Sequence, residues 1–192
     1  MKKKAKLLLY TLALSISPLA VNAHIMGGNG LADGVLHPLL GLDHLLAMVA
    51  VGIIGTRYKD KAVWLIPSAF VISMVTGGFI WISGLHIPFA EAGIALSVIF
   101  LGLAIAMKRN VPFHLTIAFV AVSAIFHGHA HATEMPVLLS PLLYSIGFVI
   151  STSSLHITGI LLGRVAAKTE TSVKLLRYAG ASMGILGIFF LF

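Results

Sequence analysis

The sequence contains no cysteine, few charged residues and no nucleotide-binding motif. Without cysteine, disulfide bonds and thiolate ligands are excluded, so a metal site would have to use histidine, carboxylate, methionine or backbone groups. Charged residues make up only 10% of the chain, whereas soluble domains carry about a quarter. The absence of a G-x-x-x-x-G-K-[ST] segment argues against intrinsic ATP hydrolysis as an energy source.

What the chain does contain is apolar residues, which make up 58% of its 192 positions and give a mean hydropathy of +1.02. This composition predicts an all-α, polytopic membrane protein surrounded by the lipid bilayer. At this length the apolar segments must share one bundle, so we expect a single domain. The net charge of +7 does not indicate nucleic-acid binding, because the basic residues form neither one amphipathic face nor an extended tail.

Residues 1–23 are typical of a cleaved secretory signal peptide. A basic start precedes an apolar run over 7–20, and Val21-Asn22-Ala23 meets the small-x-small rule for cleavage. Cleavage after Ala23 would make His24 the first residue of the mature domain, 24–192, where its α-amine and imidazole form a chelating pair. Two alternatives stay open: the segment is an uncleaved anchor helix, or His24 is an unordered terminal residue.

Six apolar segments are long enough to cross a hydrocarbon core of about 30 Å. They cover about 35–56, 62–84, 90–107, 112–131, 138–163 and 172–192. The basic residues of the mature chain lie in alternate connections only, at Arg57, Lys59, Lys61, Lys108, Arg109, Arg164, Lys168, Lys174 and Arg177. The positive-inside rule makes those connections cytoplasmic and places the mature N-terminus outside, in agreement with the signal peptide. We therefore expect a multi-pass protein of the cytoplasmic (inner) membrane.

Two clusters inside these segments combine histidine with an acid. The first holds His37, Asp43 and His44, and the second holds His127, His131 and Glu134. On a continuous helix the two histidines of the first cluster share a face, and the spacing i, i+4, i+7 puts the second cluster on one stripe. The predicted topology brings both clusters to the outer half of the membrane. Ionisable groups at such depth usually mark a cavity or pathway, so we expect a metal site between the two helices.

Other polar residues are candidates for smaller parts. Asp43 suits either metal ligation or the holding of an imidazole by its second nitrogen. His129 points away from the stripe, toward the rim or a neighbour, and is a candidate for capturing an ion. His156 is predicted in the inner half, where it is either an exit-side ligand or an interhelical hydrogen-bond donor. Glu91 opens the third segment, where a helix-dipole role is sufficient.

Small residues at Gly180-x-x-x-Gly184 permit close contact between helices. We interpret this spacing as packing within the bundle rather than as a dimer interface, and a homo-oligomer stays open.

Three motifs carry a resemblance to a known family. They are His37-Pro38 through Asp43-His44 with Met48 and Gly52 beyond, Phe126-His127-Gly128 through Ala130-His131 and Glu134, and Leu155-His156. With a signal peptide that ends before His24, they make the chain similar to the HupE/UreJ family, membrane proteins implicated in nickel or cobalt uptake for hydrogenase and urease. Ala132 departs from the glycine expected in the family. The resemblance implies a divalent-metal permease with the motif residues as ligands; the residues alone indicate a polytopic protein with an outward-facing histidine and carboxylate site.

The function expected from this resemblance is secondary transport of Ni²⁺, with Co²⁺ next, linked to hydrogenase or urease maturation. The metal is cargo, and we expect no prosthetic group and no catalytic residue. The chief alternative is an intramembrane hydrolase in which the same cluster binds zinc and Glu134 acts as general base. Against it, neither H-E-x-x-H nor G-x-S-x-G occurs in the sequence. A third reading is a haem-binding electron carrier that uses paired histidines.

Overall fold

The computed structural model describes residues 30–109, 111–135 and 140–192, and the regular structure in these ranges is α-helical. The described helices are α2 (Gly30–Leu40), α3 (Leu42–Gly55), α4 (Ala62–Ile82), α5 (Ala90–Ala106), α6 (Phe113–Glu134), α7 (Pro141–Ala166) and α8 (Glu170–Phe189). The all-α prediction is therefore confirmed for this part of the chain. The predicted signal peptide, 1–23, and His24 lie outside the described residues.

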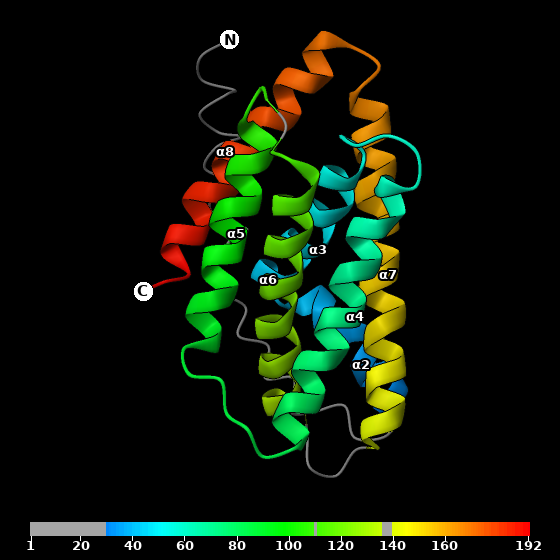
Figure 1. The fold of residues 1–192 in the computed structure, drawn as a ribbon, viewed down its shortest axis with the longest axis vertical. Coiled ribbons are helices and arrows are strands. Elements are labelled where there is room, and N and C mark those ends of the chain that lie inside the picture. The colour runs from blue at the N-terminus through cyan, green and yellow to red at the C-terminus, as the bar shows by residue number, and fades with distance from the viewer. Residues whose placement is uncertain (1–29, 110, 136–139) are drawn as a thin grey trace, which may run out of the picture.

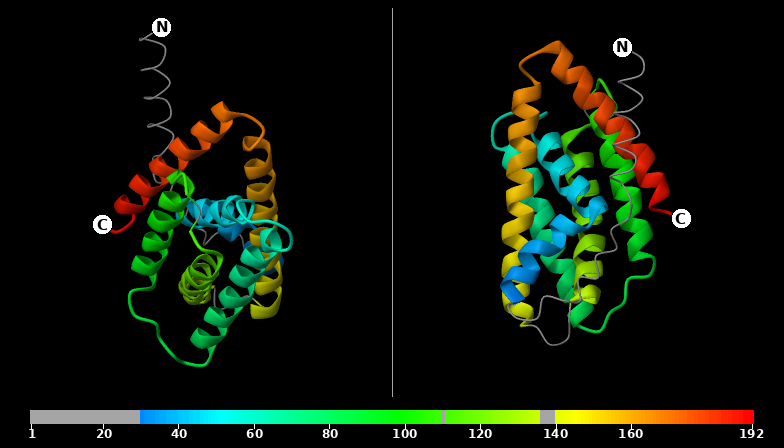
Figure 2. Two further views of the ribbon diagram at one scale, coloured as in Figure 1. Left: turned by 45° about the horizontal axis from the view of Figure 1, so that its top comes forward. Right: turned by 180° about the vertical axis from the view of Figure 1, so that it is seen from behind.

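Helix α3 lies at the centre of the bundle (Figures 1 and 2). It packs against α7, α5 and α4, and nine of its 14 residues are buried. The other helices associate in pairs around it: α4 with α6, α5 with α8, and α2 with α7. Side chains that leave α3 in different directions therefore reach most of the interior of the bundle.

The predicted first span, 35–56, is not one straight helix. Helices α2 and α3 meet at Gly41 with an angle of 82°, as the right-hand view of Figure 2 shows. Pro38, near the end of α2, has no N–H to continue the helical hydrogen-bond ladder, and Gly41 is extended, with φ −83° and ψ 113°. A Cβ at Gly41 would lie 3.0 Å from His44 Nδ1 and 3.1 Å from Asp43 Oδ1. Glycine therefore leaves room for both side chains at the bend.

Three of the described helices, α4, α6 and α7, are long and apolar enough to cross a membrane, and the bent pair α2–α3 makes a fourth if it counts as one span. Helix α5 is apolar but has only 17 residues. Helix α8 carries Glu170, Lys174 and Arg177. These helices support a membrane protein, whereas the count of six spans stays a prediction.

The bundle exposes apolar side chains and buries polar ones. Ile72, Phe79, Leu142 and Phe189 are 66–71% exposed. The buried polar residues are His44, Ser97, Thr116, Ser123, His127, His129, His131, Ser151, Thr152 and His156. A lipid environment solvates the apolar exterior, and a polar interior at that depth marks a binding site or pathway.

The paired helices approach each other closely at glycine, as α4–α6 and α5–α8 illustrate. A Cβ at Gly128 of α6 would lie 1.8 Å from the carbonyl oxygen of Met74 on α4, and a Cβ at Gly102 of α5 would lie 2.6 Å from that of Gly180 on α8. A Cβ at Gly102 would also meet the backbone nitrogen of Gly184 at 2.6 Å. The Gly180-x-x-x-Gly184 stripe therefore packs inside the bundle, as the sequence predicted.

Candidate metal-binding site

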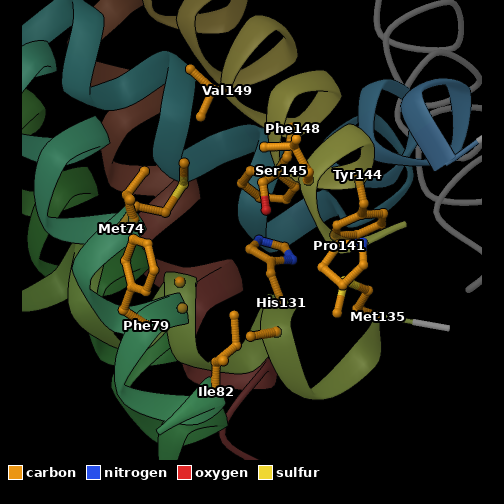
Figure 3. A pocket seen from close by; sticks show the side chains of 15 residues that line it. Met74, Phe79, Ile82, His131, Met135, Pro141, Tyr144, Ser145, Phe148 and Val149 are labelled. Atoms are coloured by element: carbon orange, nitrogen blue, oxygen red, sulfur yellow. The ribbon is translucent and has the colours of Figure 1, made fainter. Parts of the chain in front are cut away.

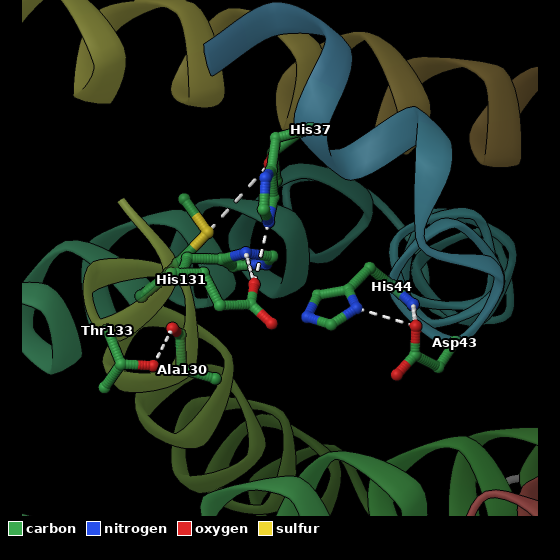
Figure 4. Close-up of polar contacts among 9 residues, drawn as sticks. His37, Asp43, His44, Ala130, His131 and Thr133 are labelled. Atoms are coloured by element: carbon green, nitrogen blue, oxygen red, sulfur yellow. Dashed lines mark hydrogen bonds and ion pairs between the residues drawn. The ribbon is translucent and has the colours of Figure 1, made fainter. Parts of the chain in front are cut away.

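Three ligand groups converge at one end of the bundle, here called the His37 end. His37 comes from α2, and His131 and Glu134 come from α6; one ligand atom of each lies within 4.8 Å of the others. Glu134 Oε2 accepts a hydrogen bond from His37 Nε2 at 2.9 Å, and the same oxygen lies 3.7 Å from His131 Nδ1. Figure 4 shows the His37 and His131 rings close to each other at this point. The Glu134 side chain is 44% exposed and that of His131 is 5% exposed. The group therefore leads from the surface into the interior.

His131 is the centre of this group. Its ring centroid lies 4.9 Å from that of His37 and 4.1 Å from that of His44. Among the described residues, neither of its buried ring nitrogens has a hydrogen-bond partner, and buried polar atoms are rarely left in that state. The His131 ring thus contacts both His37 and His44. The shared helix face predicted for these two histidines is wrong, because the 82° bend at Gly41 lies between them.

Asp43 fixes the orientation of His44. One carboxylate oxygen, Oδ1, accepts hydrogen bonds from His44 Nδ1 at 2.7 Å and from the His44 backbone N–H at 2.8 Å. Because Nδ1 donates, the lone pair of the imidazole is on Nε2, which is buried and unpartnered in the described ranges. Carboxylates orient metal-binding histidines in this way. Of the two roles predicted for Asp43, the structure shows the holding of an imidazole.

His127 repeats this pattern one helical turn, about 6 Å, further into the bundle. Its side chain is fully buried, and its Nδ1 lies 2.9 Å from the Ser123 carbonyl oxygen, which can only accept. Nε2 again carries the lone pair and has no partner in the part of the chain that the structure describes. The ring lies 5.2 Å from that of His44. Four imidazoles therefore form a continuous series in the order His37, His131, His44 and His127.

A cavity of about 380 Å³ lies beside His131, between α4, α6 and α7. Figure 3 shows the His131 ring among apolar side chains that include Phe79, Phe148 and Met135. Apart from His131 and the sulfurs of Met74 and Met135, this lining offers few metal ligands. The candidate metal site is therefore the imidazole series, and the cavity borders it on one side.

Glu91 is a residue to which the sequence analysis assigned only a helix-dipole role. We expected it to serve only the dipole of α5, in whose first turn it lies. The structure brings its carboxylate within electrostatic range of Glu134, Asp43 and His44. A cluster of carboxylates attracts cations to the His37 end. The topology could have predicted this position of Glu91, because the connection before α5 returns to the end of the bundle that carries Glu134.

Two predicted site residues lie apart from the series. His129 Nε2 accepts a hydrogen bond from the Ile87 N–H at 2.9 Å, and its ring packs 5.3 Å from that of Trp81, so it faces the connection between α4 and α5. His156 lies deeper, on α7, where its Nδ1 donates to the Met48 carbonyl at 2.8 Å. His24 lies outside the described residues.

Buried imidazoles in series, a partly exposed carboxylate and an apolar exterior define a helical membrane protein with a candidate site for a divalent transition metal. The chain matches the family described as HupE / UreJ protein over residues 11–190 and belongs to that family. It is 39% identical over 178 residues to Protein HupE of Rhizobium leguminosarum bv. viciae, a match that covers 92% of this chain and 93% of that protein. The resemblance predicted from the motifs is thus confirmed. No solved structure matches the chain significantly.

Proposed function

We propose that the protein is a permease that takes up a divalent transition metal, with Ni²⁺ as the first candidate and Co²⁺ as the second. The observation that carries the proposal is the convergence of His37, His131 and Glu134 within 4.8 Å. In the proposed orientation the His37 end faces outward, the mature N-terminus is outside, and the basic connections face the cytoplasm. This orientation follows from the positive-inside rule and corresponds to the cytoplasmic (inner) membrane.

The ligand types favour borderline metals. Imidazole suits Ni, Co, Cu and Zn, while sites for Mg and Ca use oxygen ligands. His37, His131 and Glu134 would replace part of the hydration shell, and the unpartnered Nε2 atoms of His44 and His127 would receive the ion next. Nearby carboxylates offset part of the divalent charge in the low-dielectric interior. The affinity must stay moderate, because a permease releases its cargo.

Two further predicted residues have different places in the proposal. His24 remains a capture residue at the mature N-terminus. His129 is left out of the ion path, because its Nε2 already accepts the Ile87 N–H.

The membrane potential supplies a driving force for inward movement. An inside-negative potential favours transfer of a divalent ion by about 4.6 kcal/mol per 100 mV. Coupling to the potential, to protons or to a partner protein therefore suffices without nucleotide hydrolysis. By family resemblance, the imported metal would supply the maturation of hydrogenase or urease.

Metal uptake into liposomes tests the proposal directly. The purified chain is reconstituted, and Ni²⁺ accumulation is measured by mass spectrometry with Co²⁺, Cu²⁺ and Zn²⁺ as competitors. Glu134→Gln keeps the shape of the side chain but removes its charge, so we expect at least a tenfold lower initial rate. Glu170→Gln, on an exposed carboxylate at the start of α8, is the matched control. Uptake at the parental rate by correctly inserted Glu134→Gln and His37→Ala variants would refute the proposed site.

The zinc-dependent hydrolase receives no support from the comparisons. The same reconstituted protein nevertheless separates the two functions. Metal-dependent turnover of a lipid or amide without metal flux would favour the hydrolase, whereas flux without turnover favours the permease.

A further inference from the structure

His156 has the same arrangement as His44 and His127 at a deeper level of the bundle. Its Nδ1 donates to the Met48 carbonyl of α3 at 2.8 Å. Its Nε2 is buried and has no partner within the described residues, and the residue is 2% exposed. A histidine that only joined α3 to α7 would use one nitrogen and leave the other unpaired in the interior, where polar atoms are normally satisfied. The free Nε2 therefore points to a ligand.

Phe70 of α4 contacts both His156 and the last imidazole of the series. Its ring centroid lies 5.4 Å from that of His127 and 5.2 Å from that of His156, with a T-shaped arrangement in both pairs. Phe70 is fully buried. One apolar ring therefore contacts two histidines, each of which has a buried Nε2 without a hydrogen-bond partner among the described residues.

The buried stripe of α7 gives the depth of His156. Tyr144, Phe148, Thr152 and His156 follow at intervals of four residues, and all are buried. The Tyr144 ring is 5.8 Å from that of His37, so the stripe begins at the level of the first ligand group. Twelve residues of helix span about 18 Å, more than half of a hydrocarbon core of about 30 Å.

We propose that His156 is an inner metal station, reached from His127 when the Phe70 ring moves aside. The inference rests on the proposed function and extends it from one site to a path with two stations. One turn before His156, the Thr152 hydroxyl lies 3.9 Å from the Met74 sulfur, which adds oxygen and thioether donors that a borderline metal accepts. An apolar ring that contacts both stations lets an ion rest at either one without an open pore.

The first experiment separates binding from passage. In His156→Gln the amide can still donate to the Met48 carbonyl, but the imidazole Nε2 is lost. We expect Ni²⁺ binding to the detergent-purified full chain to keep its Kd within about twofold, while uptake into liposomes falls at least tenfold. His114→Gln, on an exposed histidine at the start of α6, should change neither quantity. Uptake by His156→Gln at the wild-type rate would overturn the inner station. Absence of uptake by the wild-type chain would instead overturn the proposed function, and with it the path.

A second experiment measures metal binding at the inner station without relying on transport. The variant His37→Gln/His44→Gln/His127→Gln/His131→Gln/Glu134→Gln lacks the first ligand group and the rest of the imidazole series, and Co²⁺ is the probe. X-ray absorption should show imidazole-bound Co²⁺ in this variant, and adding His156→Gln should lower Co²⁺ association at least tenfold. Coordination by oxygen alone, or Co²⁺ association that does not depend on His156, would overturn the inference. The oxygen-only outcome decides the matter even where the His156→Gln chain fails to fold.

Discussion

Gly128→Ala tests the crossing of α4 and α6, on which the position of the imidazole series depends. The added Cβ would lie 1.8 Å from the carbonyl oxygen of Met74 and 2.6 Å from its carbonyl carbon. An ordinary contact needs about 3.5 Å, so the two helices would have to separate locally by about 1.7 Å. Overpacking of this kind costs about 1–3 kcal/mol and lowers Tm by roughly 2–12 °C in a chain of this size.

The same substitution should weaken metal binding. His127 and His131 flank Gly128 on α6, whereas His44 belongs to α3, so the separation moves part of the ligand set relative to the rest. Ligand sets must be held within about 0.5 Å, and we therefore expect the Kd for Ni²⁺ to rise at least tenfold. Thermal unfolding and isothermal titration of the detergent-purified protein measure the two effects.

Gly78→Ala is the matched control on the same helix pair. A Cβ at Gly78 meets only the Gly128 carbonyl oxygen, at an ordinary 3.7 Å, so Tm and Kd should stay at their wild-type values. The reasoning is refuted if Gly128→Ala and Gly78→Ala behave alike in both measurements, because α4 and α6 would then not be in backbone contact at Gly128.

Three further substitutions address single contacts. Asp43→Asn removes the charged acceptor that holds His44. Loss of such an orienting group costs about 10–100-fold in metal affinity, so titration should show a Kd raised by that factor with little change in Tm. An unchanged Kd would contradict the orienting role. Arg57→Gln removes guanidinium hydrogen bonds to the carbonyl oxygens of Ala104, at 2.6 Å, and Met107, at 3.3 Å, beside the C-terminal end of α5. The free energy of unfolding should fall by about 1–3 kcal/mol, as measured by thermal unfolding. A wild-type Tm would show that these contacts do not stabilise the bundle. His129→Leu removes the acceptor of the Ile87 N–H and should lower Tm while leaving the Kd for Ni²⁺ within about twofold; a tenfold weaker Kd would show that His129 is a ligand after all.

Part of the site could be predicted from the sequence because α6 is a continuous helix. The spacing of His127, His131 and Glu134 needs only helical periodicity to place them on one stripe, and the structure has all three on α6. The same argument fails for His37 and His44. Pro38 and Gly41 end one helix and begin another, so a count of residues between the two histidines no longer gives their relative direction.

The sequence by itself determined the class of protein and the chemistry of the ligands. An apolar chain without cysteine must span lipid as helices and can offer a metal only nitrogen, oxygen and thioether donors. Only the tertiary structure decided which of these donors meet. His131 joins His37 to His44, Asp43 holds His44, and Glu91 comes within range of Glu134, because each of these relations depends on the bend at Gly41 or on how separate helices pack. The tertiary structure also decided which ring nitrogen of His156 stays free, since the Met48 carbonyl of α3 takes its Nδ1 and leaves Nε2 for an ion. For His44 and His127 a neighbouring carboxylate or carbonyl in the same helix takes Nδ1.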